Sequence, residues 1–297
     1  MRRRGILIAA GALAFAVAGA SGAADVPARP SAGCERTSLA TGERLERTID
    51  VGGVARSSIV DAPDALVPGK PVPLLLDFHG LGHSAAGVWG VSGFRALARR
   101  EPFVTAYPQG LPVRLETPRR VFEGVGWEVR STTGNRDLGL VARLLDRLEA
   151  DYCIDRARVY ATGFSNGAYL SELIGCAMAD RVAAVAPVSG GLPSVRCEPS
   201  RPVPILIHHG RLDDIVDVAQ GRRARDEWAR IDGCSADVVP SPAGTATADG
   251  IRCDSAACGG GSVVEMCEGD FAHHWPPSAT ERIWAFFVGH PMPPPAR

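Results

Sequence analysis

Short apolar runs that end in glycine or in polar residues alternate with helical segments along most of this chain. Runs of this kind lie at residues 70–87, 101–110, 157–163, 182–191, 202–210 and 262–269. Apolar strands separated by amphipathic helices predict a mainly parallel sheet, because such strands are buried on both faces by helices. We therefore expect an α/β fold with one central sheet in a single domain. A ligand site is expected at the carboxyl ends of the strands.

Two segments have the clearest helical pattern. The segment 136–152 places leucine and valine side chains on one helical face, and Asp137 is suited to cap its start. The segment 278–290 opens with a capping box of Ser278 and Glu281, and its apolar side chains would dock it on the core. Both helices would cover the predicted sheet.

Other segments lack a helical pattern. The stretch 44–63 predicts two strands joined at Gly52-Gly53, which would form an opening hairpin. The stretches 109–135 and 235–262 have no clear periodicity, and we expect both to be loops near the mouth of the site. The proline-rich tail after His290 is expected to be extended and exposed to solvent.

Residues 1–24 have the layout of a secretory signal peptide. Three arginines precede an apolar run from Ile6 to about Ala18, and small residues suited to cleavage follow it. A membrane anchor is the alternative, but the run is short for a span of about 20 residues. A lipoprotein would need a cysteine directly after the run, whereas Cys34 lies farther along without the usual leucine before it. We expect residues 25–297 to be an exported domain.

Charge and cysteine content restrict the partners of this domain. The formal net charge is −1 and the sequence pI is about 6.7, so no nucleic-acid partner is indicated. All eight cysteines lie in the exported part, which predicts up to four disulfides. A zinc site would use paired C-x-x-C spacing, which the sequence lacks. We expect no metal, no cofactor and no stable membrane insertion.

The pattern G-x-S-x-G occurs at residues 163–167, with Ser165 at its centre. A serine hydroxyl is a poor nucleophile unless a base takes its proton and donors stabilise the resulting oxyanion. A sharp strand-to-helix turn exposes such a serine, and the crowding of that turn requires glycine two residues to either side. A predicted strand at 158–162 and a predicted helix at 166–175 flank the motif. Ser165 is therefore predicted to be a nucleophile.

An acid and a histidine follow this serine in the chain order expected of the α/β-hydrolase fold. The acid candidates are Asp213, Asp214 and Asp217, and the histidine candidates are His273 and His274. The acids follow one predicted strand, and the histidines follow the next. Order and position at strand ends thus both agree with a catalytic triad, although the residues alone leave these alternatives open.

The loop 79–82, with the sequence HGLG, follows an earlier apolar strand that Asp77 interrupts. Glycines in such a loop let backbone N–H groups approach a substrate carbonyl and form an oxyanion hole. We expect one donor from the backbone of Leu81 or Gly82. The other donor is expected from Asn166, next to the nucleophile.

These motifs resemble those of the secreted esterases grouped with poly(3-hydroxybutyrate) depolymerases and with the feruloyl and acetylxylan esterases of carbohydrate esterase family 1. The resemblance covers about residues 33–288 and rests on HGLG, YPQG, GFSNG, HHGRLDDIV and HHWP. It implies an α/β-hydrolase fold with Asp213 as the acid and His273 as the histidine. The implied triad is then Ser165–His273–Asp213.

The same resemblance implies two disulfides, Cys234–Cys258 and Cys176–Cys197. The chain departs from the family at Asp77, where the strand is usually apolar throughout. Another departure is the stretch 270–272, where a glycine pair usually precedes the histidine. These departures leave the triad intact and limit what the family implies about the substrate.

These observations together predict a secreted serine carboxylesterase that acts through an acyl-enzyme. Feruloyl or acetyl esters of plant polysaccharides, or related small esters, are the expected substrates, and hydroxybutyrate oligomers are the alternative. Trp127, Phe164 and Trp275 are candidates for an aromatic wall against the substrate, with core packing as their other explanation. A peptidase or acyltransferase on the same fold, or a non-catalytic binding protein, are further alternatives. The sequence does not predict the oligomeric state.

Overall fold

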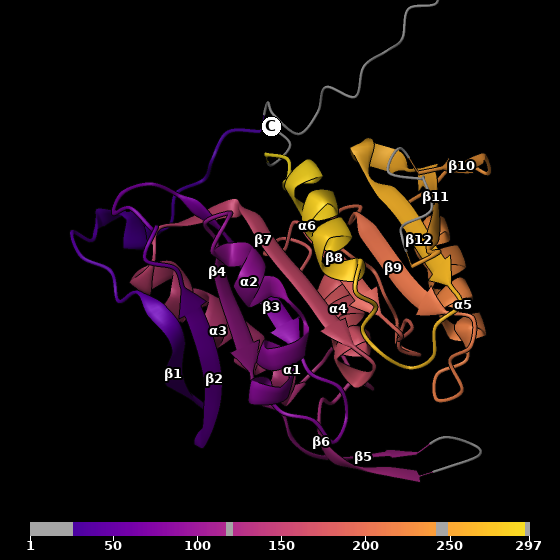
Figure 1. The fold of residues 1–297 in the computed structure, drawn as a ribbon, viewed down its shortest axis with the longest axis horizontal. Coiled ribbons are helices and arrows are strands. Elements are labelled where there is room, and N and C mark those ends of the chain that lie inside the picture. Colours follow the sequence, from indigo (N-terminus) through magenta and orange to yellow (C-terminus); the bar gives the residue numbers. More distant parts are fainter. Residues whose placement is uncertain (1–25, 117–120, 242–248, 295–297) are drawn as a thin grey trace, which may run out of the picture.

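The computed structural model describes residues 26–116, 121–241 and 249–294, so the expected signal peptide lies outside the described residues. A ten-stranded sheet crosses this part of the chain in the order β1-β2-β4-β3-β7-β8-β9-β12-β11-β10 (Figure 1). Its strands are β1 (Gly42–Val51), β2 (Val54–Ala62), β3 (Val72–Phe78), β4 (Val104–Pro108), β7 (Ile154–Phe164), β8 (Ala184–Val188), β9 (Ile205–Gly210), β10 (Val238–Pro240), β11 (Arg252–Ala257) and β12 (Val263–Gly269). The six central strands pair in parallel, and the strands at both edges pair antiparallel. The predicted α/β fold with a mainly parallel sheet is confirmed.

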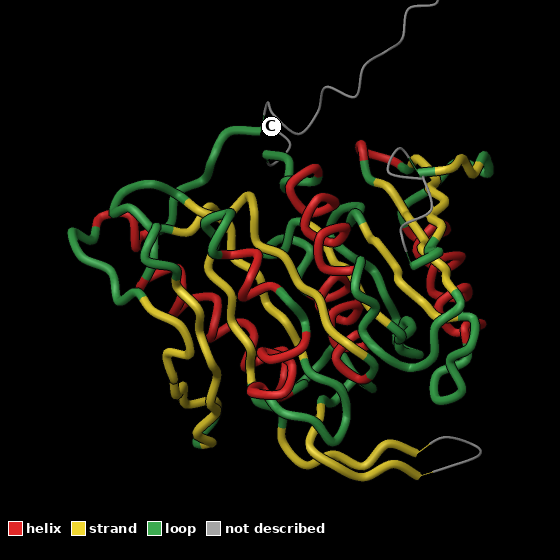
Figure 2. The backbone as a smooth tube through the Cα atoms, in the orientation of Figure 1, coloured by secondary structure: helices red, strands yellow, loops and turns green. Residues whose placement is uncertain are grey.

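Helices cover both faces of this sheet (Figures 1 and 2). One face carries α1 (Ala85–Val91), α2 (Phe94–Ala98) and α6 (Ala279–Gly289). The other face carries α3 (Arg136–Asp151), α4 (Asn166–Ala177) and α5 (Val218–Ile231). Two short 3₁₀ turns are η1 (Ala32–Glu35) and η2 (Gly259–Gly261). Leu75 of β3 packs with α2 and α6, whereas its neighbours Leu74 and Leu76 pack with α3 to α5. This burial on both sides explains the continuous apolar runs of the central strands. None of the helices in the described residues is long and apolar enough to span a bilayer.

Two segments that we expected to be loops contain strands. The segment 109–135 holds β5 (Leu111–Glu116) and β6 (Val121–Gly126), which pair as a separate hairpin that projects from the body (Figure 1). The segment 235–262 holds β10 and β11, which extend one edge of the main sheet. Both pairs lie outside the doubly covered centre, so they lack the continuous apolar run that marks a buried strand. The hairpin predicted at Gly52-Gly53 is confirmed as β1–β2.

The cap of α3 differs from the prediction. Asn135 is the N-cap residue, and its side-chain oxygen accepts hydrogen bonds from the backbone N–H groups of Asp137 and Leu138. Asp137, the predicted cap, is instead fully buried and forms an ion pair with Arg56 at 2.6 Å. Asn135, directly before the helix, is thus the cap, and the carboxylate of Asp137 in the first turn binds Arg56 instead.

The predicted capping box at the start of α6 is absent. Ser278 has helical backbone angles and makes no capping hydrogen bond. Its hydroxyl donates to Asp249 at 2.9 Å, and Glu281 forms an ion pair with Arg100. A capping serine needs extended backbone angles to reach the next turn, and those of Ser278 do not allow it.

The start of the C-terminal tail is docked, contrary to the prediction of an exposed segment. Met292 is buried in the core cluster that contains α2 and α6. Its backbone N–H donates to the carbonyl oxygen of Ala157 at 2.7 Å. Only the residues beyond it, Pro293 and Pro294, are exposed within the described part of the tail.

All eight cysteines form disulfides. The bonds are Cys34–Cys153, Cys176–Cys197, Cys234–Cys258 and Cys253–Cys267. The structure therefore contains both bonds that the family resemblance implied. The sulfur of Cys34 is bonded to another cysteine, which leaves it no valence for a lipid. The cluster of Cys253, Glu265 and Cys267 offers metal-ligand atoms close together, but its two sulfurs are joined to each other.

Candidate active site

Ser165 lies at a sharp turn between β7 and α4. Its backbone angles are φ 54° and ψ −118°, which are unusual for a residue with a side chain and hold the hydroxyl away from the strand. A Cβ atom at Gly163 would lie 2.5 Å from the backbone of Gly167, and one at Gly167 would lie 2.1 Å from the carbonyl oxygen of Phe78. Only glycine fits at these two positions. The turn therefore has the geometry that the G-x-S-x-G pattern predicts.

Asp213 and His273 are hydrogen-bonded partners. His273 Nδ1 lies 2.7 Å from Asp213 Oδ2, while Asp213 Oδ1 accepts from the backbone N–H groups of Ile215 and Val216. A carboxylate can only accept, so His273 carries its hydrogen on Nδ1 and its Nε2 is a proton acceptor when the ring is neutral. The arrangement selects one histidine tautomer.

The neighbouring candidates for acid and base are placed differently. Asp214 and His274 are exposed. Asp217 is the N-cap of α5, where its carboxylate accepts from the backbone N–H of Ala219 at 2.8 Å. Of the three candidate acids Asp213, Asp214 and Asp217, only Asp213 thus has a histidine partner among the described residues.

A second histidine, which was not predicted from the sequence, contacts the acid. His209 at the end of β9 is buried, and its Nε2 lies 2.8 Å from the carbonyl oxygen of Val216 and 3.6 Å from Asp213 Oδ2. Burial lowers the pKa of His209, and the hydrogen bond to Val216 opposes this in part. The HHG ending of the strand was a visible signal, but the pattern alone does not say which ring faces the acid.

The HGLG loop is held in place by hydrogen bonds. The N–H of Gly82 donates to the carbonyl oxygen of Val125 at 2.8 Å. This leaves Leu81 as the better of the two predicted oxyanion donors, because the hydrogen of Gly82 is already used. His79 Nδ1 lies 2.7 Å from the carbonyl oxygen of Gly80, and Nε2 accepts from the N–H of Gly110 at 3.0 Å. His79 therefore ties the loop to the end of β4.

The side chain of Asn166 does not face the substrate region. Its Oδ1 accepts from the backbone N–H of Trp127 at 2.7 Å, and its Nδ2 donates to the carbonyl oxygen of Trp127 at 3.3 Å. Asn166 is the first residue of α4, so a donor to an oxyanion from this residue would be its backbone N–H. The side chain instead fixes the chain that follows β6.

Trp127 cannot form an aromatic wall against the substrate, which corrects that prediction. Its side chain is fully buried, packs edge-on against Phe78 and donates from Nε1 to the carbonyl oxygen of His79 at 2.7 Å. The indole is thus a packing residue beneath the HGLG loop. Tryptophan suits this position because it fills a large volume and still satisfies its N–H.

Phe164 and Trp275 are both partly exposed. The ring centre of Phe164 lies 4.7 Å from that of His273, so this side chain borders the catalytic candidate. Trp275 donates from Nε1 to Thr280 at 3.0 Å and packs edge-on against Phe94. Phe164 therefore keeps the predicted position beside the site, while Trp275 is tied to the layer of α2 and α6.

A buried ion pair supports the loops beside the HGLG turn. Arg56 binds Asp137 at 2.6 Å and also donates to the carbonyl oxygen of Gln109 at 3.2 Å. The other oxygen of Asp137 accepts from the backbone N–H of Glu128 at 2.8 Å. Loss of one partner from such a buried pair would leave an uncompensated charge. The pair thus joins β2, α3 and the chain segments on either side of the hairpin.

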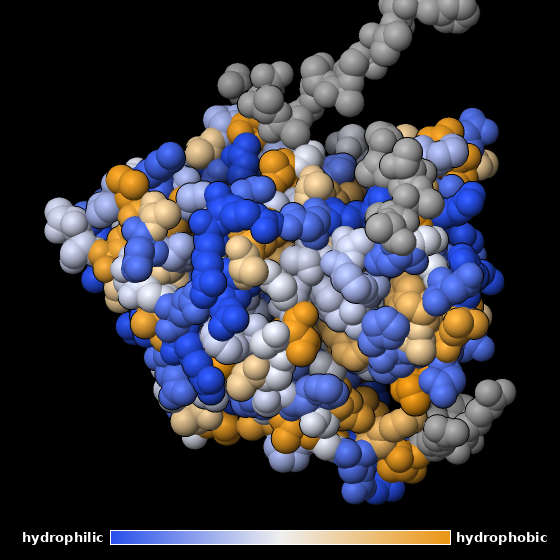
Figure 3. Space-filling model, viewed as in Figure 1, coloured by the Kyte–Doolittle hydropathy of each residue, from blue (hydrophilic) through white to orange (hydrophobic). Residues whose placement is uncertain are grey.

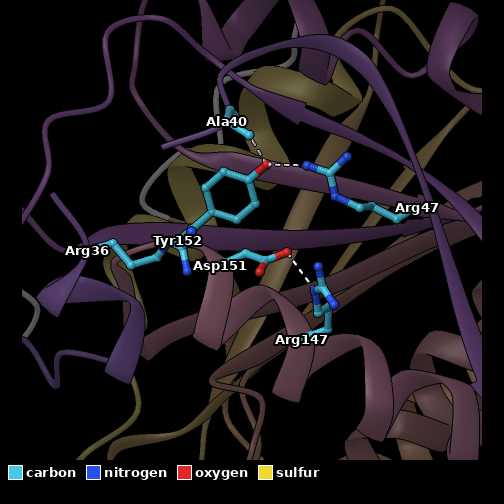
Figure 4. Close-up of a pocket in the computed structure, with 6 residues that line it drawn as sticks. All are labelled: Arg36, Ala40, Arg47, Arg147, Asp151 and Tyr152. Atoms are coloured by element: carbon cyan, nitrogen blue, oxygen red, sulfur yellow. Dashed lines mark hydrogen bonds and ion pairs between the residues drawn. The ribbon is translucent and has the colours of Figure 1, made fainter. Parts of the chain in front are cut away.

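Two cavities of the described residues have no part in this site. One of about 280 Å³ lies between Arg36, Arg47, Arg147 and Tyr152 (Figure 4). Asp151 pairs with Arg147 there, and the Tyr152 hydroxyl contacts Arg47. The other, of about 520 Å³, is lined by residues 195–202 and by residues around Arg230. Ser165, Asp213 and His273 line neither cavity.

Comparisons with known proteins show that the chain is similar to esterases. Residues 68–241 match the family described as Phospholipase/Carboxylesterase. The chain is 28% identical to feruloyl esterase D of Neurospora crassa over 285 residues, which cover 88% of this chain and 90% of that protein. It is also 28% identical to the probable feruloyl esterase C of Aspergillus terreus, over 79% of this chain and 84% of that protein.

Solved structures show the same fold. An acetyl xylan esterase from Aspergillus awamori superimposes with a TM-score of 0.63, at 15% sequence identity, and covers 82% of this chain and 99% of its own. The comparisons and the geometry of the site thus indicate hydrolysis of a carboxylic ester.

Proposed function

Because the chain belongs to the phospholipase and carboxylesterase family and is a carboxylic ester hydrolase of the α/β-hydrolase fold, we propose that Ser165, His273 and Asp213 are its catalytic triad. The single observation that carries this proposal is the strained backbone of Ser165 at the end of β7. Such strain persists only where the surrounding structure enforces it, and it is typical of a nucleophile held for reaction.

In the proposed mechanism, His273 Nε2 takes the proton of the Ser165 hydroxyl as the oxygen attacks the ester carbonyl. Asp213 holds the histidine ring in the required tautomer. The backbone N–H groups of Leu81 and Asn166 stabilise the negative oxygen of the tetrahedral intermediate. The protonated histidine then gives its proton to the departing alcohol, which leaves an acyl-enzyme. Water, activated by the same histidine, releases the acid and restores the serine.

We propose feruloyl or acetyl esters of plant polysaccharides as the substrates. The similarity to proteins named feruloyl esterase supports this class, as does the length over which the similarity extends. The four disulfides support action outside the reducing cytosol, since such bonds persist in oxidising compartments. The proposed location is therefore extracellular or periplasmic.

The proposal is tested with a fluorophosphonate probe and with methyl ferulate, before and after the substitution Ser165→Ala. We expect the wild-type protein to be labelled and to hydrolyse the ester, and the variant to lose labelling and roughly 10³-fold or more in kcat. Ser200→Ala, at an exposed serine remote from the triad, is the control and should match the wild type. Full activity of Ser165→Ala would contradict the proposed nucleophile.

A further inference from the structure

One face of the β5–β6 hairpin has no charged side chain, and the strand register shows which face this is. Partners directly across an antiparallel pair point to the same face. One face holds Leu111 with Gly126, Val113 with Gly124, and Leu115 with Phe122. The other face holds Arg114 opposite Glu123, and these two form an ion pair. The same second face also holds Pro112 opposite Val125 and Glu116 opposite Val121, so it mixes charged and apolar side chains. The first face carries no charged side chain.

The apolar face is turned toward the HGLG loop and the nucleophile helix. A Cβ atom at Gly124 would lie 3.3 Å from the backbone nitrogen of Gly82. A Cβ atom at Gly126 would lie 2.8 Å from Leu81 Cδ1 and 2.5 Å from Asn166 Oδ1. Residues two apart on a strand share a face. The face that contains Gly124 and Gly126 therefore continues along the hairpin, away from the predicted oxyanion donors, and this continuation is the outer part of the face.

Three side chains form this outer part, which we call the hairpin stripe: Val113, Leu115 and Phe122. Each is half-buried, yet none packs against a core cluster of the described residues. The three offer hydrocarbon alone and no hydrogen-bonding side-chain atom. From Leu111 to Leu115 the strand spans about 13 Å, at about 3.3 Å per residue. In Figure 3, hydrophobic and hydrophilic residues lie side by side at the lower edge, where Figure 1 places the hairpin.

We propose that the hairpin stripe binds the aromatic ring of a hydroxycinnamoyl group while the ester carbonyl of the same molecule lies beside Leu81. This inference rests on the proposed esterase function and specifies its acyl group. A planar ring would bury apolar surface against Leu115 and stack on Phe122. Sugar hydroxyls would gain no hydrogen bond there, so the polysaccharide is not the part that the stripe recognises.

The stripe also explains selectivity between acyl groups. An acetyl group has no atoms beyond its methyl carbon, so it would not extend along a strand that projects from the oxyanion loop. A hydroxycinnamoyl group would extend along it. The stripe therefore favours the larger acyl group, and it takes the role that was predicted for Trp127.

The test measures kcat and KM of the full chain for methyl ferulate and for methyl acetate, in the wild type, Phe122→Ala and Leu115→Ala. We expect the ratio of kcat/KM for ferulate to that for acetate to fall about tenfold in Phe122→Ala, mainly through KM, and less in Leu115→Ala. Val121→Ala is the matched control, because Val121 is an exposed neighbour on the opposite face of the same strand. Its ratio should equal that of the wild type.

The outcomes separate this inference from the proposed function. An unchanged ratio in both stripe variants, with ferulate hydrolysed by the wild type, overturns the inference alone. Hydrolysis of acetate but not ferulate by the wild type also overturns the inference and restricts the function to acetyl esters. Hydrolysis of neither ester overturns the proposed function. Equal thermal midpoints of the variants show that the exposed hairpin tolerates each substitution.

Discussion

Two regions at the carboxyl edge of the sheet each combine an aspartate with a histidine. After β9 and β12, Asp213 accepts two backbone hydrogen bonds and binds the ring of His273, whose side chain is 15% exposed. At the end of β3, Asp77 and His79 are both fully buried. There the histidine binds backbone groups and, at 3.5 Å, the side-chain amide of Gln109, and no carboxylate. Among the described residues, the buried oxygens of Asp77 have at most the hydroxyl of Ser92 as a partner.

This difference in surroundings changes the chemistry of the same residue types. Burial lowers the pKa of His79 to about 4, and its hydrogen bond to Gly80 opposes this only in part. Burial raises the pKa of Asp77 to about 7, with a smaller opposite effect of Ser92. His79 is therefore neutral at pH 7 and acts as a fixed brace for the HGLG loop. We propose that proton transfer occurs in the other region, where the histidine has a carboxylate partner and contact with solvent.

The largest effect is expected from Asp213→Asn. An amide can donate to His273 Nδ1, which would favour the wrong tautomer and leave Nε2 protonated. We expect kcat for methyl ferulate to fall by roughly 10³ to 10⁴, as for the corresponding change in serine proteases. Asp214→Asn, at the exposed neighbour, is the control and should retain wild-type kcat. Equal kcat in the two variants would remove Asp213 from the mechanism.

The next effect concerns stability and comes from Asp77→Asn. With a folded pKa of about 7 and an unfolded pKa of about 4, Asp77 is neutral in the folded state at acidic pH. Its contribution to stability is present in full below about pH 4 and is lost as pH rises to about 7. The unfolding free energy falls by at most about 4 kcal/mol over this pH range, since one pKa unit corresponds to about 1.4 kcal/mol.

Urea unfolding of the wild type and Asp77→Asn at several pH values would measure this loss. We expect the variant to lose less stability than the wild type between pH 4 and pH 8. Burial also raises the pKa of Glu172 to about 8. Glu172 is present in both proteins, so its effect on stability cancels in the comparison. Parallel curves for the two proteins would show that the pKa of Asp77 is not raised.

A smaller effect on catalysis is expected from His79→Ala. The substitution removes the acceptor for Gly110 N–H and frees the HGLG loop that carries Leu81. We expect kcat to fall roughly 10²-fold with a smaller change in KM, because oxyanion stabilisation acts in the transition state. The pH dependence of kcat should keep its shape, since His79 does not titrate near neutral pH. A shifted profile would indicate that His79 transfers protons.

The smallest effect is expected from His209→Phe. The ring nitrogen that binds Val216 would be lost, and with it one contact that orders the loop of Asp213. We expect a loss of several-fold in kcat, because the two backbone donors to Asp213 remain. A loss as large as that of Asp213→Asn would show that His209 holds the acid in place.

Much of the fold was predictable because its pattern is local. Buried parallel strands need apolar side chains on both faces, and each of the central runs showed this directly. The strands β5, β6, β10 and β11 were missed because they are not buried on both faces, whereas the turn at Gly52-Gly53 indicated the edge strands β1 and β2. Asp137 was assigned to a helix cap for a related reason, since no local pattern reveals that Arg56 lies beside it in the folded chain.

The sequence by itself determined the turn at Ser165, because glycines at 163 and 167 and the flanking strand and helix are local requirements of that turn. It also determined the order of serine, acid and histidine along the chain. Only the tertiary structure decided which way each side chain faces: that Trp127 is buried, that Gly82 has already given its hydrogen to Val125, and that the apolar face of the hairpin meets Leu81. These outcomes depend on contacts between segments distant in the chain, and burial and hydrogen bonding at such contacts are set by packing.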